Sequence, residues 1–256
     1  MSLITLPKAP INFFQIFLSE SSLEPPPLLQ RMQATAEQFF PGHSYQLFNR
    51  LSLRECLADT CGKEVLTAYD RLIPLAYKAD LARYCLVHHF GGWYADITLK
   101  FTSGIAFENS IEFIYFYDYG DGLPSPFRTG HDCMNAFFYA AAGSPILSAA
   151  IEMVLRNCHD KSYGISSLCP TGPTLFGRAV AMHAPKYNQL FGHFMPLTPF
   201  HPNKNKSFVA PDGSIIARHK SAWHSHHPGP GDLSVFGVQG TNSYVDLWTA
   251  RKIYAS

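Results

Sequence analysis

The chain has 256 residues, of which 46% are hydrophobic and 14% aromatic, so we expect residues 1–256 to form a single domain with a sizeable core. A formal net charge of +1, with 15% charged residues, argues against nucleic acid as a partner. No apolar run reaches the roughly 20 residues of a transmembrane span, and the six cysteines lack a Cys-x-x-Cys pair. We therefore expect reduced thiols and a cytoplasmic location, with contact at the inner face of a membrane left open.

Strand and helix patterns alternate through the first ninety residues. Proline and glycine clusters separate them, and the periodicity predicts strands over residues 10–17 and 45–48 and helices over residues 28–40, 51–69 (broken near Gly62) and 75–90. Such alternation is typical of an α/β sheet that holds a nucleotide site at the carboxyl ends of its strands.

The helix over residues 75–90 has an apolar stripe at three- and four-residue steps, which predicts one buried face. Asp80 and Arg83 fall outside that stripe and, three residues apart, are neighbours on the helix surface. Gly91 supplies the glycine that commonly ends a helix in left-handed geometry.

From residue 93 to residue 101 the apolar period changes to two, which predicts a strand. Asp96 and Thr98 then lie side by side on one face. A carboxylate with a second oxygen two positions on can hold a hard divalent cation, and such a cation can neutralise a leaving diphosphate. The sequence predicts Mn²⁺ or Mg²⁺ at Asp96 and Thr98.

The second half of the chain continues the alternation. An aromatic strand over 111–117 precedes turn residues 118–122, and a second strand covers 137–141. Ser144 and Pro145 suit the start of a helix, and Thr171-Gly172-Pro173 starts another that runs to about residue 184. Residues 208–210 and 214–218 flank a turn and predict a hairpin.

The central segment carries a resemblance to a known family. The segment resembles the DXD-containing sugar-binding region of glycosyltransferase family 32, related to the glucosylating domains of large clostridial toxins, where the pattern runs roughly A-x-x-A-D-x-x-R-Y-x-x-L-x-x-x-G-G-x-Y-x-D-x-D. Leu86 or Val87 matches the leucine of that pattern. The second Asp of the motif is replaced here by Thr98, a much weaker cation ligand. The principal matching residues are Asp80, Arg83, Tyr84, Gly91, Gly92, Tyr94 and Asp96.

Weaker similarities extend over most of the chain. Residues 10–17 resemble the family's opening strand, and residues 135–147 resemble a region in which Ser144 takes the place of a histidine. Thr171-Gly172-Pro173 looks like the family's turn before a helix, and residues 219–223 resemble its closing H-x-x-x-S-W segment.

The resemblance implies an α/β fold of GT-A type, with a mixed, mainly parallel sheet flanked by helices. It implies transfer of a sugar from a nucleoside-diphosphate sugar to a hydroxyl of a glycan, lipid-linked sugar or protein, with retention at the anomeric carbon. Asp96 and Arg83 would be catalytic, and His219 would be a further candidate ligand for the cation. The residues expected at the nucleotide sugar are Asp80, Arg83, Tyr94, Asp96, Asn135 and Trp223.

Simpler interpretations stand beside these. Asp80 and Arg83 could form an exposed ion pair, Asp96 could pair with Lys100, and Asn135 with Asp132 could belong to a solvated turn. Thr98 also favours a second function, a nucleotide-sugar-binding protein with lost or weak transferase activity. A third, a metallohydrolase using the histidines at positions 219–227, lacks an acidic partner at zinc-site spacing.

Overall fold

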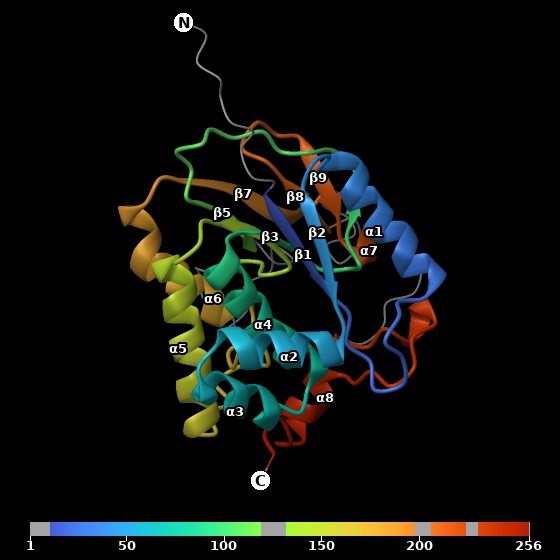
Figure 1. Ribbon diagram of the computed structural model, residues 1–256, viewed down its shortest axis with the longest axis vertical. Coiled ribbons are helices and arrows are strands. Elements are labelled where there is room, and N and C mark those ends of the chain that lie inside the picture. Colours follow the sequence, from blue (N-terminus) through green and yellow to red (C-terminus); the bar gives the residue numbers. More distant parts are fainter. Residues whose placement is uncertain (1–10, 119–131, 198–205, 224–229, 256) are drawn as a thin grey trace, which may run out of the picture.

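The computed structural model describes residues 11–118, 132–197, 206–223 and 230–255 (Figure 1). Its strands form one nine-stranded sheet in the order β2-β1-β3-β6-β5-β7-β8-β9-β4. The strands are β1 Asn12–Ile16, β2 Ser44–Phe48, β3 Gly92–Ala95, β4 Lys100–Phe101, β5 Phe113–Asp118, β6 Phe137–Ala140, β7 Gln189–Pro196, β8 Lys206–Val209 and β9 Ile215–Arg218. The α-helices are α1 Pro27–Phe39, α2 Arg50–Thr60, α3 Lys63–Arg71, α4 Leu75–Phe90, α5 Pro145–His159, α6 Pro173–His183, α7 Lys220–Trp223 and α8 Tyr244–Thr249.

The sheet is mixed, and helices flank it, as expected. It is not mainly parallel, however. Among the described strands, the pairs β1–β2, β1–β3 and β5–β7 are parallel, whereas β3–β6, β5–β6, β7–β8, β8–β9 and β4–β9 are antiparallel. The difference arises because β6 inserts in the opposite direction between β3 and β5, and because the β8–β9 hairpin extends the sheet beyond β7.

Two hydrophobic cores cover the two faces of the sheet. On one face Phe14, Tyr94 and Phe138 pack against buried residues of helices α2 to α6. On the other, Phe13 and Trp93 pack with residues of α1 and of the β8–β9 hairpin. Figure 1 shows α2 to α6 gathered on one side, with α1 at the right of the view. Alternate residues of one strand thus enter different cores, the two-residue period expected of a strand covered on both faces.

Helix α4 departs from the expected single buried stripe, because it is buried on nearly all sides from Asp80 to Val87. The helix lies in the middle of its layer, in contact with α2, α3, α5 and with strands β1, β3 and β6. It ends at Gly91, whose φ of 66° is left-handed, and a Cβ there would lie 2.8 Å from the backbone nitrogen of Ala142. The glycine stop is therefore confirmed, and it permits the close approach of the chain after β6.

The strand expected over residues 93–101 is two strands joined by a turn. β3 ends at Ala95, the Leu99 N–H donates to the Asp96 carbonyl at 3.0 Å, and β4 pairs with β9 rather than with the neighbours of β3. The period-two pattern continues through the turn because Leu99 and Phe101 return to the same core as Trp93. The turn leaves Asp96 at the carboxyl end of β3.

Most other elements fall where the sequence predicts them, including the break between α2 and α3 and the β8–β9 hairpin. β7, α7 and α8 were not expected. Residues 119–122 of the expected turn, and the histidines at 224, 226 and 227, lie outside the described residues. No described helix is both long and apolar enough to cross a membrane. All six cysteines have free thiols, as expected, and the single domain stays a prediction.

Candidate functional site

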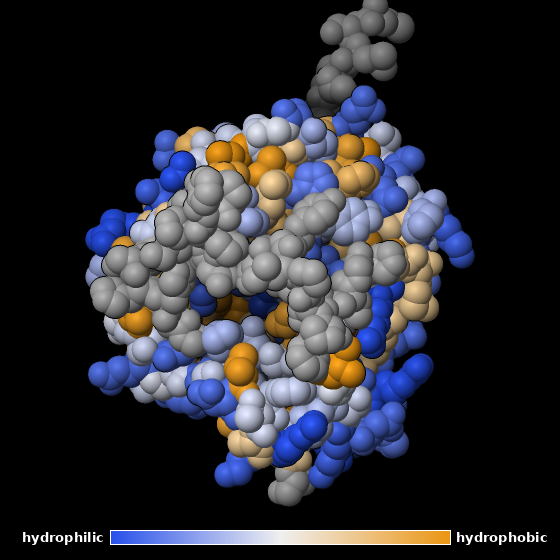
Figure 2. Space-filling view, turned by 180° about the vertical axis from the view of Figure 1, so that it is seen from behind, coloured by the Kyte–Doolittle hydropathy of each residue, from blue (hydrophilic) through white to orange (hydrophobic). Residues whose placement is uncertain are grey.

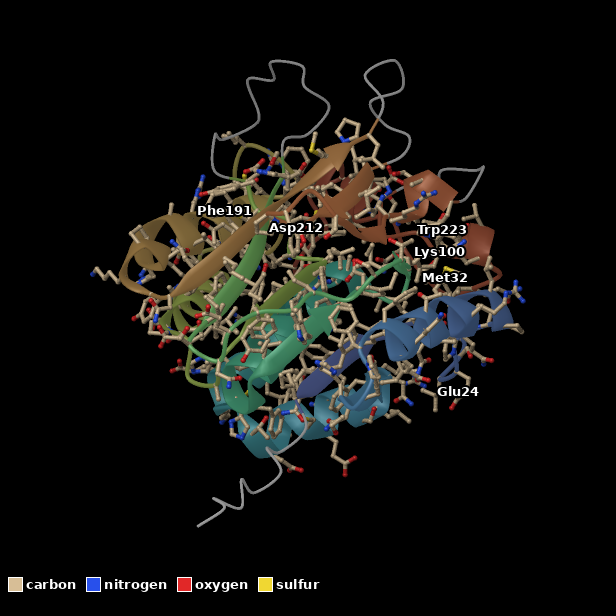
Figure 3. All side chains as sticks on the ribbon, turned by 90° about the horizontal axis from the view of Figure 1, so that it is seen from above. Glu24, Met32, Lys100, Phe191, Asp212 and Trp223 are labelled. Atoms are coloured by element: carbon tan, nitrogen blue, oxygen red, sulfur yellow. The ribbon has the colours of Figure 1, made fainter. Side chains whose placement is uncertain are left out.

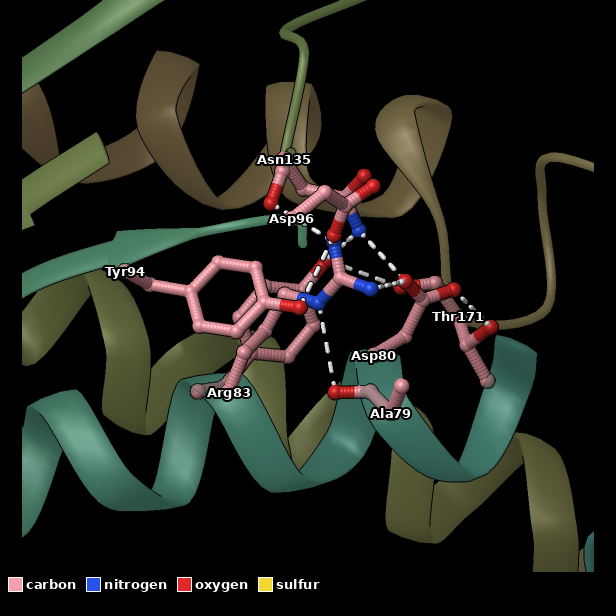
Figure 4. Close-up of polar contacts among 8 residues, drawn as sticks. Ala79, Asp80, Arg83, Tyr94, Asp96, Asn135 and Thr171 are labelled. Atoms are coloured by element: carbon pink, nitrogen blue, oxygen red, sulfur yellow. Dashed lines mark hydrogen bonds and ion pairs between the residues drawn. The ribbon is translucent and has the colours of Figure 1, made fainter. Parts of the chain in front are cut away.

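The candidate site forms where α4 passes the carboxyl end of β3. β6 runs antiparallel to β3, so the residues just before β6 lie beside those just after β3, and the Asp96 N–H donates to the Ala136 carbonyl at 2.8 Å. Asp80 and Arg83 reach the same place from α4 (Figure 4). The structure therefore brings together residues that are distant in sequence.

Arg83 is the centre of this cluster. Its Nε donates to the Ala79 carbonyl at 3.2 Å, and its Nη1 donates to the Asn135 carbonyl at 2.8 Å. Its Nη2 lies 3.1 Å from Asp80 Oδ1, and its Nη1 lies 3.2 Å from Asp96 Oδ1. These four contacts occupy most of the five N–H donors of a guanidinium, so the side chain has one orientation (Figure 4).

Asp80 is buried and fully engaged. Oδ1 accepts from the Asn135 side-chain amide at 2.9 Å, and Oδ2 accepts from the Thr171 hydroxyl at 2.7 Å, in addition to the Arg83 contact. Burial raises the pKa of Asp80, and Arg83, Thr171 and Asn135 oppose that rise by favouring the carboxylate. The exposed ion pair considered above is therefore wrong, since the Arg83 and Asp80 side chains are only 6% and 10% exposed.

Asp96 differs from its neighbours in being open to solvent, with a side chain 33% exposed. Its Oδ1 accepts from the Tyr94 hydroxyl at 2.8 Å as well as pairing with Arg83, and the guanidinium carbon lies 4.5 Å from the centre of the Tyr94 ring. Burial alone would lower the pKa of Arg83, but the neighbouring Tyr94, Asp96 and Asp80 raise it on balance. The cluster therefore presents one oriented carboxylate, Asp96, to the outside. No described contact joins Asp96 to Lys100, whose side chain is exposed.

Tyr84 and Thr171 also belong to the cluster, although the sequence motifs that contain them assign them no role. The Tyr84 hydroxyl donates to the Thr171 carbonyl at 2.9 Å and accepts from the Asn135 amide at 2.8 Å. Both residues are buried, and Thr171 stands at the turn before α6. Burial raises the pKa of Tyr84, which keeps the hydroxyl protonated as a donor. The sequence signal that could have assigned these two residues to the site is their position in the A-D-x-x-R-Y and T-G-P patterns.

Asn135 and Asp132 are buried, so the solvated turn considered for them is wrong. Asn135 uses both its carbonyl and its side chain within the cluster, whereas Asp132 accepts from the Asp118 N–H through its carbonyl at 2.9 Å.

The space-filling view in Figure 2 shows a face of the molecule that is hollowed near its centre, with hydrophilic and hydrophobic residues both visible in the hollow.

Helix α7 borders the cluster on the other side of the turn after β3. The Trp223 Nε1–H donates to the Thr98 carbonyl at 3.1 Å, and its ring centroid lies 5.6 Å from that of Phe236. Figure 3 shows Trp223 on the same side of the molecule as Lys100. The structure thus places the Trp223 segment next to the Asp96 turn. Its contact with a nucleotide sugar stays a prediction.

Lys220, the first residue of α7, was not singled out in the sequence. Its side chain is half-buried, and burial lowers its pKa while the charges of Asp96 and Asp232 oppose that change. The ammonium group therefore lies within electrostatic reach of both carboxylates. Asp232 is itself fixed through Oδ1, which accepts from the Ser234 N–H at 2.8 Å and from the Thr241 hydroxyl at 3.2 Å.

The described residues do not fit a resident divalent cation. Asp96 is a single carboxylate whose Oδ1 is already bonded, and Thr98 can add only a neutral oxygen. His219 Nδ1 accepts from the Ser221 N–H at 3.3 Å and lies 3.0 Å from its hydroxyl, so that nitrogen is occupied within its own turn. Among the residues that were described, no three His, Cys, Asp or Glu side chains converge as a metal site. The Mn²⁺ or Mg²⁺ expected from the sequence stays a prediction.

Comparisons with known proteins identify a shared fold. No family model matches the chain, and no curated protein matches its sequence. Among solved structures, the chain is similar to "PaToxG Glycosyltransferase", with a TM-score of 0.51 and 14% sequence identity, over 70% of this chain and 72% of that one. The predicted α/β fold of GT-A type is therefore confirmed at the level of the fold.

Proposed function

We propose that this chain is a glycosyltransferase that moves a sugar from a nucleoside-diphosphate sugar to a hydroxyl of a glycan, lipid-linked sugar or protein, with retention. The observation that carries the proposal is the Asp96 carboxylate, fixed by Arg83 and Tyr94 at the carboxyl end of β3 yet open to solvent. Ligands of α/β sheets bind at that end of the strands. The fold shared with a glycosyltransferase structure supports the same function.

In the proposed reaction, the bond between the anomeric carbon and the diphosphate oxygen breaks, and a bond from the acceptor oxygen to that carbon forms. The diphosphate keeps the electron pair of the broken bond and takes the proton of the acceptor hydroxyl. Stabilising the leaving diphosphate would be the main contribution of the protein. Asp96 would accept hydrogen bonds from donor hydroxyls, with Asp80 and Asn135 orienting Arg83 beside it.

The burial of Arg83 refines its proposed role. Since four of its contacts are internal, at most about one N–H remains for a ligand. Arg83 would therefore act mostly by fixing Asp96 and by its positive charge, which is poorly screened in a buried position. Direct contact between Arg83 and the donor stays part of the proposal.

A second candidate function is nucleotide-sugar binding without transfer. It is favoured by Thr98, which replaces the second carboxylate of the motif and leaves a single carboxylate at the turn. The two candidates share the binding site and differ only in the chemical step, so one experiment can separate them.

The test is a titration of UDP- and GDP-sugars into the protein, with and without Mn²⁺, read by calorimetry and by hydrolysis of the donor. Binding together with slow hydrolysis of one donor is the result expected of a transferase. Binding with no hydrolysis, and no transfer to sugar or peptide hydroxyls, would favour the second candidate. The absence of binding to every donor would remove both.

A further inference from the structure

The turn after β3 raises an electrostatic problem for a diphosphate ligand. Asp96 is partly exposed there, and a nucleoside diphosphate brought beside it would place several negative charges near a carboxylate. Arg83 offsets this only in part, because it also pairs with the buried Asp80. An additional positive charge is needed near Asp96, and the described residues alone offer a poor donor set for a divalent cation.

Lys220 has the properties that this position requires. Helix α7 is held against the turn by the hydrogen bond from Trp223 to the Thr98 carbonyl at 3.1 Å. The Lys220 ammonium lies within electrostatic reach of Asp96 and of Asp232. Within the described ranges, it forms neither a hydrogen bond nor an ion pair with either of them. Asp232 is instead bonded to Ser234 and Thr241.

A half-buried ammonium group that has no hydrogen-bond or ion-pair partner among the described residues is unfavourable in the free protein. Removing such a charge from water costs free energy unless hydrogen bonds and an opposite charge compensate it. A phosphate oxygen would supply both, since lysine binds phosphate as a compact cation with three rotatable donors. Lys220 therefore needs a negatively charged hydrogen-bond acceptor, and a diphosphate beside Asp96 needs a positive charge, so each meets the requirement of the other.

We propose that Lys220 binds the diphosphate of the nucleotide sugar directly and supplies, without a protein-bound divalent cation, the positive charge that the turn with Thr98 lacks. The inference rests on the proposed function and adds a residue and a charge source to it. During transfer Lys220 would keep its proton and stabilise the negative charge that builds up on the leaving diphosphate. It makes and breaks no covalent bond.

The experiment measures the affinity of the full chain for UDP and GDP by calorimetry in the presence of EDTA. The wild type should bind one of them without added metal. Lys220→Met should weaken that binding about 10- to 100-fold, because a charge-assisted contact to phosphate is lost, whereas Lys220→Arg should restore most of it. Melting curves of both variants establish that they fold.

Lys100→Met is the matched control. It removes one exposed positive charge from the neighbouring strand β4, on the same side of the molecule as Trp223 (Figure 3), and should leave the affinity within about twofold of the wild type. Unchanged diphosphate binding in a folded Lys220→Met protein would overturn the inference. So would wild-type binding that requires Mn²⁺. In both cases the proposed function survives, whereas a wild type that binds neither diphosphate under any condition removes the function and the inference together.

Discussion

Two arginine–aspartate pairs in this chain have similar chemistry and opposite surroundings. Arg54 of α2 and Asp70 of α3 form two parallel hydrogen bonds of 3.0 and 2.8 Å, and their side chains are 52% and 45% exposed. Arg83 and Asp80 of α4 are 3.1 Å apart and only 6% and 10% exposed. An exposed pair of this kind contributes about 0 to 1 kcal/mol to stability, because water screens it.

The buried pair needs further partners, and the structure supplies them. Thr171, Asn135 and Asp96 all bond to one or other member of the pair, which offsets the cost of removing its charges from water. A hydrophobic pair would fill the same space more simply. The exposed pair of Arg54 and Asp70 simply links two helices. The buried pair of Asp80 and Arg83 is instead part of a polar site, and burial is what distinguishes the two.

The largest effect expected is on stability. Asp80→Asn should lower the free energy of unfolding by about 3 to 5 kcal/mol, because it leaves the buried Arg83 charge without its closest partner on α4. Asp70→Asn, the matched change in the exposed pair, should cost about 1 kcal/mol or less. Chemical denaturation of the two variants measures both values, and similar losses would erase the distinction between the pairs.

The next effect is on turnover. Asp96→Asn should reduce donor hydrolysis about 100- to 1,000-fold, since it removes the carboxylate that the described cluster presents to solvent. The fold should survive, because the side chain is partly exposed and the amide can still accept from Tyr94. Steady-state rates with melting curves provide the check. A folded variant with a near-normal rate would show that Asp96 has no part in the reaction.

Arg83→Lys should have a smaller effect. The variant keeps the charge but loses the planar set of donors that reaches Ala79, Asn135, Asp80 and Asp96 together. We expect kcat/KM for the donor to fall about 10- to 100-fold, or roughly 1.4 to 3 kcal/mol. Arg54→Lys is the control and should be silent. Two silent variants would separate the buried network from the reaction and leave only the fold in common with a glycosyltransferase.

The smallest effect concerns Thr98. Thr98→Asp restores the second carboxylate of the sequence motif and should tighten Mn²⁺ binding several-fold, because carboxylate oxygens bind hard cations better than a hydroxyl. Calorimetric titration of Mn²⁺ in the presence of UDP measures it, and the turnover rate need not change. If Mn²⁺ affinity stays the same or falls, the side chain at position 98 does not face the cation position.

The sequence predicts local structure well where one segment carries its own signal. The stop at Gly91, the break near Gly62 and the β8–β9 hairpin each follow from residues within a few positions. Strand β7 was not predicted from the sequence, because its pattern contains Gly192, and glycine is unfavourable in a strand. The glycine is needed there, since a Cβ would collide with the Val209 carbonyl of the neighbouring strand β8.

The site is predictable only as far as its motif extends. The A-D-x-x-R-Y and G-G-x-Y-x-D patterns located Asp80, Arg83 and Asp96, but no local pattern states that the middle of α4 is buried on nearly all sides. The Thr171 bond to Asp80 joins residues 91 positions apart, and the closeness of Lys220 to Asp96 depends on the fold of α7 against the turn. Such contacts follow from tertiary packing, and no local periodic pattern in the sequence indicates them.

Donor hydrolysis tests most directly whether the buried network and the carboxylate that it orients form a nucleotide-sugar site. Donor hydrolysis is assayed over a panel of UDP- and GDP-sugars for the wild type, Asp96→Asn and Asp70→Asn. We expect the wild type and Asp70→Asn to hydrolyse the same donor at the same rate and a folded Asp96→Asn not to hydrolyse it. Equal rates in all three proteins, or hydrolysis of no donor by the wild type, would contradict this expectation.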